Sequence, residues 1–207
     1  MRILKSAAAA VFLSFAVAAP VAMVPVNMAT ASTAEASRVL IDRMGADILK
    51  IYKDKEITKQ EKANAFAKLF EAHFDLNPVA RFVLGRYWRV ATPDEKAEFT
   101  KQFHSYIVKT YSARMGSYSG QEFEVVGARD LGKREAIVKS EVRSPDGRIF
   151  KVDWRLLTRD GKTRVTDLII EGVSLAVTHR SEFAAVINRG GGKVATLIEQ
   201  LKTQNAK

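Results

Sequence analysis

The sequence predicts an α+β fold in which helices cover a twisted, four-stranded antiparallel sheet. Three observations predict it. Helix-start signals and 3.6-residue apolar periodicity dominate up to about residue 115. Two-residue periodicity with short turns follows from residue 121, and helical patterns return near residue 174. Because an antiparallel sheet usually buries one face, helices should cover that face, and such a strongly twisted sheet can form a half-open cone around an apolar cavity.

Four helices are expected before the sheet. The S-x-x-E pattern at 32–35 and the T-x-x-E pattern at 58–61 are capping boxes, which begin helices that run to about residues 52 and 74. A short helix should begin at Asn77-Pro78, with Asn as its cap, and should end or bend at Gly85. At 92–95 a cap, a proline and two acids begin a helix that should run to about residue 115 and stop at Gly116.

Consecutive strands joined by tight turns predict an antiparallel meander. In the strand at 149–157, apolar residues occupy one face and charged residues the other. The turns are S-P-D-G at 144–147 and Asp160-Gly161. The expected strands are 123–126, 135–142, 149–157 and 163–171, and the expected helices after them are 174–188 and 193–203.

The first 31 residues have the pattern of a secretory signal peptide. Arg2 and Lys5 precede an apolar stretch, and the small residues at 29–31 form an A-x-A cleavage site. An uncleaved membrane anchor is the alternative, because the apolar stretch is just long enough to span a bilayer. Prolines within that stretch favour cleavage. We therefore expect a signal peptide at 1–31 and one domain at 32–207, exported to the periplasm.

Charge and composition restrict the possible partners and chemistry. The formal net charge is +10 and falls by two, to +8, without residues 1–31. Such a surface attracts anionic partners, and export argues against nucleic acid among them. The chain has no cysteine, which excludes disulfides and thiolate chemistry. Its three histidines have no metal-ligand spacing, and Ser174 lies outside any nucleophile-elbow motif. We predict no catalytic residue, no metal site and no cofactor.

Apolar residues on the predicted inward faces either fill a core or line a ligand cavity, and periodicity cannot distinguish these two arrangements. The set comprises Phe82, Trp88, Phe99, Phe103, Tyr106, Phe150, Val152, Trp154, Ile169 and Val173.

Two segments resemble a known family. The stretch A-R-F-V-L-G-R-Y-W-R at 80–89, followed by Thr92 and Glu95, is similar to the A-x-x-x-L-G-x-x-W-R…T-x-x-E segment of the MlaC family, also called the toluene-tolerance auxiliary proteins. The D-W-R-L run at 153–156 and the V-T-D-L-I-I-E-G-V-S-L run at 165–175 resemble a second family signature. The similarity covers about residues 35 to 205, and its D-x-x-I-E-G-V-S-L run is the more specific part.

The resemblance implies a soluble, monomeric carrier of phospholipid in the periplasm, on an NTF2-like or cystatin-like fold. Such proteins shuttle lipid between an outer-membrane lipoprotein–porin complex and an inner-membrane ABC transporter with a lipid-binding ring subunit, and so maintain outer-membrane lipid asymmetry. The acyl tails would lie between sheet and helices, with the head group near Arg89 and Arg180. The matching positions are Leu84, Trp88, Trp154, Ile169, Val173 and Leu175, and periodicity adds Phe99, Phe103, Phe150 and Val152.

The segment after the last predicted strand should connect the sheet to the next helix. Gly172 should let the chain turn sharply, so that residues 173–177 carry the apolar lining of the cavity onto the next helix.

Two other functions stay open. An enzyme on an NTF2-like scaffold, acting on a small hydrophobic substrate, would need an acid–base pair inside the cavity. Asp153 and Asp167 are the candidate sheet acids, although alternation places Asp153 opposite the apolar face. A protein with a packed core could instead act through its basic surface. Phospholipid that copurifies with the protein would favour the carrier.

Overall fold

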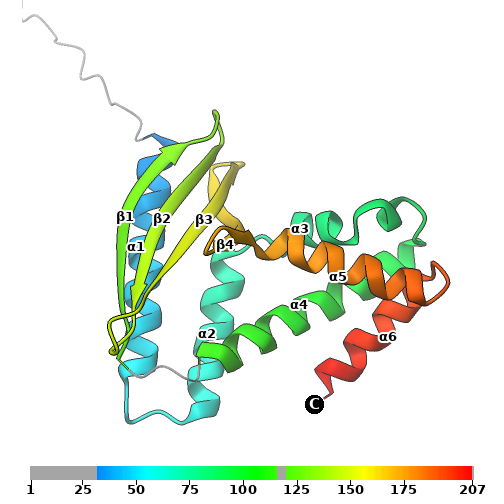
Figure 1. Ribbon diagram of the computed structural model, residues 1–207, viewed down its shortest axis with the longest axis horizontal. Coiled ribbons are helices and arrows are strands. Elements are labelled where there is room, and N and C mark those ends of the chain that lie inside the picture. The colour runs from blue at the N-terminus through cyan, green and yellow to red at the C-terminus, as the bar shows by residue number, and fades with distance from the viewer. Residues whose placement is uncertain (1–31, 116–119, 207) are drawn as a thin grey trace, which may run out of the picture. The chain divides into compact units, whose positions relative to one another are not determined.

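Helices flank an antiparallel sheet in the chain order that the sequence predicts (Figure 1). The computed structural model describes residues 32–115 and 120–206, which belong to one compact unit. The helices of this part are α1 (Thr33–Lys53), α2 (Lys59–His73), α3 (Leu76–Leu84), the 3-10 helix η1 (Gly85–Arg89), α4 (Pro93–Met115), α5 (Leu175–Arg189) and α6 (Val194–Asn205). The strands are β1 (Glu122–Asp130), β2 (Glu135–Arg143), β3 (Ile149–Arg159), β4 (Lys162–Ile170) and β5 (Val173–Ser174). The predicted α+β class is confirmed, with one short strand more than expected.

Helix starts follow the capping residues at three of the four expected sites. Ser32 Oγ accepts a hydrogen bond from the Glu35 N–H (3.1 Å), and complete capping boxes form at 58–61 and 92–95. The predicted cap of α3 is wrong, because the helix begins at Leu76 rather than after Asn77. The Asp75 N–H donates to the Val165 carbonyl of β4 (3.0 Å), so the residue just before the helix is tied to the sheet, and the helix begins two residues earlier than expected.

The sheet is an antiparallel meander with the order β1-β2-β3-β4-β5. Val138 pairs with Trp154, and Trp154 in turn pairs with Leu168, so all three side chains share one face. The predicted turn at Asp160-Gly161 is confirmed, and both residues have positive φ (51° and 72°), as a type I′ hairpin requires.

The chain turns sharply at Gly172, as predicted, but the residues after it do not line the cavity. Glu171 and Gly172 have φ of 49° and 80° and form another tight hairpin turn, after which Val173 pairs back with Ile170. Val173 is 57% exposed. The chain therefore extends the sheet by a two-residue strand before α5 begins, and Val173 adds no lining to an interior cavity.

Buried side chains form two neighbouring clusters. Helix α1 runs along β1 and β2 (Figure 1) and covers the inner face of the sheet with Ile41 and Met44. Helices α3 to α6 pack on one another around Phe99 and Phe103, which are 0% and 1% exposed. Phe74, at the end of α2, contacts both clusters. Helix α2 therefore lies where the sheet and the helical group meet.

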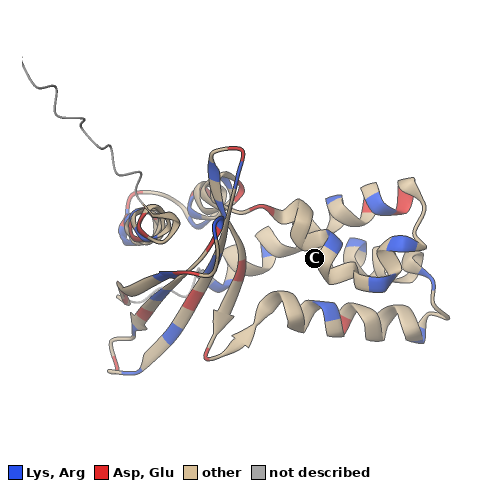
Figure 2. Cartoon of the chain, turned by 90° about the horizontal axis from the view of Figure 1, so that it is seen from above, with Lys and Arg blue, Asp and Glu red and all other residues tan. Residues whose placement is uncertain are grey.

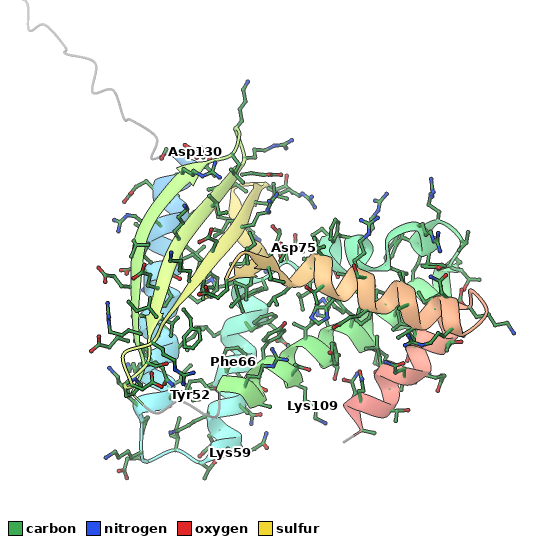
Figure 3. The ribbon with its side chains drawn as sticks, viewed as in Figure 1. Tyr52, Lys59, Phe66, Asp75, Lys109 and Asp130 are labelled. Carbon is green, nitrogen blue, oxygen red and sulfur yellow. The ribbon has the colours of Figure 1, made fainter. Side chains whose placement is uncertain are left out.

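The opposite face of the sheet carries charge of both signs, and acidic and basic positions alternate with others along the strands in Figure 2. Lys139 pairs with Asp153 and Glu141 with Lys151 on this outer face. One end of the sheet also holds α1, because Asp130 Oδ1 accepts a hydrogen bond from the Ala34 N–H (2.8 Å; Figure 3).

Within residues 32–115 and 120–206, none of the helices has the length and apolarity needed to cross a bilayer. The predicted signal peptide, its cleavage site and the predicted stop at Gly116 lie outside the described residues.

Candidate ligand-binding cavity

An apolar cavity of about 360 Å³ lies between α1, α2 and the inner face of the sheet. This volume falls in the range of small-molecule sites, roughly 300 to 1,000 Å³. Its lining is almost entirely aliphatic and aromatic. Helices α1, α2 and α4 contribute Met44, Ile48, Leu49, Tyr52, Phe66, Leu69, Phe70 and Tyr111, and the sheet contributes Phe123, Val142, Phe150, Val152, Trp154, Leu168 and Ile170.

Trp154 forms the centre of the sheet wall, and its polar atom is satisfied. The indole N–H donates to Ser140 Oγ (2.8 Å), and the Ser140 hydroxyl donates to the Val152 carbonyl (2.9 Å). Ser140 is 1% exposed. These two hydrogen bonds hold the indole ring in place. They also satisfy its N–H, because a buried donor without a partner would destabilise the fold.

Aromatic rings of α2 form the helical wall. Phe70 stacks on Phe74 with ring centroids 3.7 Å apart, and Phe66 lies 5.9 Å from Phe70. Tyr52, near the end of α1, meets Phe66 of α2 edge to face at 6.4 Å; both residues are labelled in Figure 3. The spacing of these α2 residues, four apart, places them on one face of the helix.

Gly45 allows α1 to approach the sheet closely. A Cβ atom at this position would lie 2.3 Å from two atoms of the Phe123 ring, much closer than carbon atoms can pack. Phe123 meets Trp154 edge to face at 6.3 Å. The absence of a side chain on Gly45 therefore sets the position of an aromatic ring in the cavity wall.

Polar side chains gather at one end of the cavity. Arg114, Gln121, Glu122 and Ser144 line it there, at the end of α4 and at the ends of β1 and β2. Glu122 pairs with Arg143, the residue before Ser144, so these strand ends are adjacent. Phe150 at the same end is 37% exposed. The polar groups and the exposed ring make this end the candidate mouth of the cavity.

A smaller space of about 50 Å³ adjoins the cavity on the side of the helical group. Phe70, Phe74, Tyr111 and Leu168 line both spaces and so form the partition between them. The Tyr111 hydroxyl lies 3.4 Å from His179 Nε2. Burial lowers the pKa of His179 and raises the pKa of Tyr111, so the neutral forms of both are favoured.

Three of the ten residues predicted to contact lipid line the cavity: Phe150, Val152 and Trp154. Ile169 faces the charged outer side of the sheet, because its neighbours Leu168 and Ile170 face inward and strand residues alternate. Phe103 and Leu175 line only the smaller space. Leu84 and Phe99 are 2% and 0% exposed in the helical core.

Three further predicted residues lie together, away from this cavity. Trp88, Arg89 and Arg180 line an open depression on α3, η1 and α5. Phe82, expected to face inward, is 41% exposed in the same depression. Arginines expected at the head group of a cargo lipid thus lie outside the cavity mouth, where Arg114 is found instead.

Much of the cavity lining was not among the predicted residues. Helices α1 and α2 supply Met44, Ile48 and Phe66, whose helical periodicity marks a buried stripe but does not reveal which element the stripe faces. Leu168 and Ile170 differ from the predicted Ile169 by one position, because an irregularity in the pairing at Thr166 interrupts the alternation that starts at the inward-facing Val165.

Neither sheet acid considered for an enzyme faces the cavity. Asp153 lies on the outer face. Asp167 holds the start of α5, where its carboxylate accepts hydrogen bonds from the Ser174 hydroxyl and the Ala176 N–H (3.0 Å). Among the described residues there is no group of three or more His, Asp or Glu placed to hold a metal ion.

An apolar cavity with one polar end, walled by a sheet and two helices, has the character of a site for a largely apolar small molecule. The comparisons agree. A family model described as MlaC protein matches residues 42–203. The chain belongs to the MlaC family.

Three relatives illustrate the similarity. Toluene tolerance protein ttg2D of Pseudomonas putida is 28% identical over 123 residues, and the intermembrane phospholipid transport system binding protein MlaC of Haemophilus influenzae is 25% identical over 126 residues. These alignments cover 59% and 58% of this chain and 57% of each relative. A solved phospholipid-binding protein from Ralstonia solanacearum, in complex with a phospholipid, superposes with a TM-score of 0.71 at 23% identity, over 85% of this chain and 98% of that chain. This likeness establishes the shared fold.

Proposed function

We propose that the protein is a periplasmic phospholipid carrier that holds acyl tails in the cavity between α1, α2 and the sheet. One observation carries the proposal: a cavity of about 360 Å³ with an apolar lining that opens beside polar side chains. Family membership supports it, as do relatives whose names describe phospholipid binding and transport. The proposed export to the periplasm rests on the signal-peptide pattern of residues 1–31.

Physical chemistry supports a carrier that needs no catalyst. Exposing acyl tails to water costs about 0.8 kcal/mol per methylene, so about 30 methylenes cost on the order of 20 kcal/mol. An apolar cavity that replaces this burial lets lipid cross an aqueous space. The head group carries a phosphate, which is stable only in water or beside polar partners. Arg114 and Gln121 lie at the polar end and are the proposed head-group contacts.

The transfer partners belong to the same proposal. We propose that lipid moves between an outer-membrane lipoprotein–porin complex and an inner-membrane ABC transporter, in a pathway that maintains outer-membrane lipid asymmetry. The printed name of the Haemophilus influenzae relative, a binding protein of an intermembrane phospholipid transport system, supports this assignment.

Two adjacent residues of β4 test the proposal. Leu168 faces the cavity and Ile169 faces the outer side of the sheet. Leu168→Glu places a carboxylate among apolar side chains, where the charged form is unstable without a partner. Ile169→Glu makes the same chemical change on the solvated face. We expect mass spectrometry of organic extracts to find phospholipid in the parent and in Ile169→Glu, and to find little in Leu168→Glu.

Circular dichroism confirms that each variant folds. Leu168→Trp, which fills the cavity without adding a charge, provides a second test and should also reduce bound lipid. Parent protein that carries no lipid, or equal lipid in the Leu168 and Ile169 variants, would overturn the proposal.

A further inference from the structure

A second site lies on the helical group, on residues that share none of the cavity lining. The depression on α3, η1 and α5 is lined by Arg81, Arg86, Arg89 and Arg180, and no acidic residue lines it. Arg86 donates to Asn188 Oδ1 (3.1 Å) and to the Tyr87 hydroxyl (2.8 Å). The other three arginines form no ion pair with residues in the described part of the chain.

Arg180 is held in a fixed position without using a carboxylate. Its guanidinium carbon lies 4.9 Å from the centre of the Phe82 ring. It also lies close to the backbone at Gly85, where a Cβ would lie 3.1 Å from Arg180 Nε. Gly85 has φ of 59°, a conformation that glycine adopts without strain. A guanidinium held in this way has its hydrogen-bond donors available for an anion, with little entropy left to lose.

Apolar side chains are exposed beside these cations. Phe82 is 41% exposed, and Val90, next to Arg89, is 72% exposed. Val177 is 53% exposed and lies one helical turn before Arg180 on α5, so both side chains share a face. Arginines mixed with exposed aromatic and aliphatic side chains are typical of surfaces that lie in the head-group region of a membrane.

We propose that this face docks the protein onto an anionic phospholipid bilayer. Arg81, Arg89 and Arg180 bind lipid phosphates, for which the guanidinium fork has the matching geometry. Phe82 and Val90 enter the layer between the head groups. The net charge of about +8 that remains without residues 1–31 adds long-range attraction to a negative surface. The docking site is separate from the cavity, and it does not depend on what the cavity holds.

Vesicle flotation tests this assignment with protein expressed from the full chain. We expect binding to vesicles of equimolar phosphatidylglycerol and phosphatidylcholine, weaker binding at high salt, and little binding to phosphatidylcholine alone. Each arginine near an anionic surface should contribute about fivefold in affinity, so Arg81→Gln with Arg180→Gln should weaken binding roughly 30-fold. Arg129→Gln with Arg134→Gln removes the same charge from exposed positions at the end of the sheet and should change affinity much less.

A second pair tests insertion of the apolar side chains. Val90→Asp should reduce vesicle binding, whereas Val126→Asp, at a 51% exposed position on the outer face of the sheet, should not. Lipid extraction of the same samples measures the cavity separately, and we expect unchanged cargo in all four variants. Equal losses in the test and control variants would overturn the proposal. Arginine-dependent binding to polyglutamate beads without binding to vesicles would also overturn it, because the partner would then be an acidic protein.

Discussion

The hydrogen bond between Ser140 and Trp154 makes a quantitative prediction about the cavity wall. Ser140→Ala removes the acceptor of the Trp154 indole N–H, which lies 2.8 Å away from the buried Ser140 hydroxyl. A buried donor left without a partner costs about 1–3 kcal/mol. Since 1 kcal/mol shifts the Tm of a domain of this size by about 2–4 °C, a loss of about 2 kcal/mol lowers the Tm by roughly 4–8 °C.

A double-mutant cycle isolates this interaction. In a Trp154→Phe background the indole N–H is absent, so Ser140→Ala should cost much less, with a coupling of at least about 1 kcal/mol. Thermal unfolding of lipid-free protein, followed by circular dichroism, measures all four variants. Equal effects of Ser140→Ala in the two backgrounds would refute the reasoning, because they would mean that the indole N–H finds another partner, such as water within the cavity.

Three further predictions follow from single contacts. Gly45→Ala should displace the Phe123 ring, lowering both the Tm and the lipid content, whereas Gly132→Ala, with open space around the new Cβ, should change neither. Asp167→Ala should destabilise the protein by about 1–2 kcal/mol through loss of the α5 cap, measured by urea unfolding, while Asp153→Ala on the outer face stays within about 0.5 kcal/mol. Burial lowers the pKa of His179. The positive charge of Arg114 lowers this pKa further, whereas the Glu182 and Asp167 carboxylates oppose the shift. The unfolded chain therefore binds more protons at this histidine than the folded protein does. Stability should therefore fall as the pH drops below about 6.5, and His179→Phe should flatten this fall by up to about 1.4 kcal/mol per pH unit; an unchanged slope would contradict it.

Local signals predicted the elements of this fold well, because they act over a few residues. The capping box at 58–61 and the Asp160-Gly161 turn form as expected, since each is determined by its own side chains and backbone. The cap of α3 was displaced by a distant contact, the hydrogen bond from Asp75 to Val165. A pattern within one helix cannot reveal a partner ninety residues away.

The lining of the candidate cavity was predicted only where regular alternation within one strand decides which residues face inward. Phe150, Val152 and Trp154 lie on the cavity because β3 is regular from residue 150 to 154. Leu84 and Phe99 share the same apolar character yet fill the helical core, since burial and cavity lining give the same periodicity. Core residues can be distinguished from cavity-lining residues only by the way α1 and α2 pack on the sheet. That packing depends on contacts such as the one between Gly45 and Phe123.

Fluorescence of the two tryptophans tests the carrier most directly. Trp154 lines the cavity, whereas Trp88 lies in the surface depression. After loading with a phospholipid brominated on its acyl chains, Trp88→Phe protein, whose sole tryptophan is Trp154, should lose most of its emission. Trp154→Phe protein loaded in the same way should stay bright. Quenching of Trp88 with Trp154 unaffected would place the acyl chains outside the cavity and contradict the account.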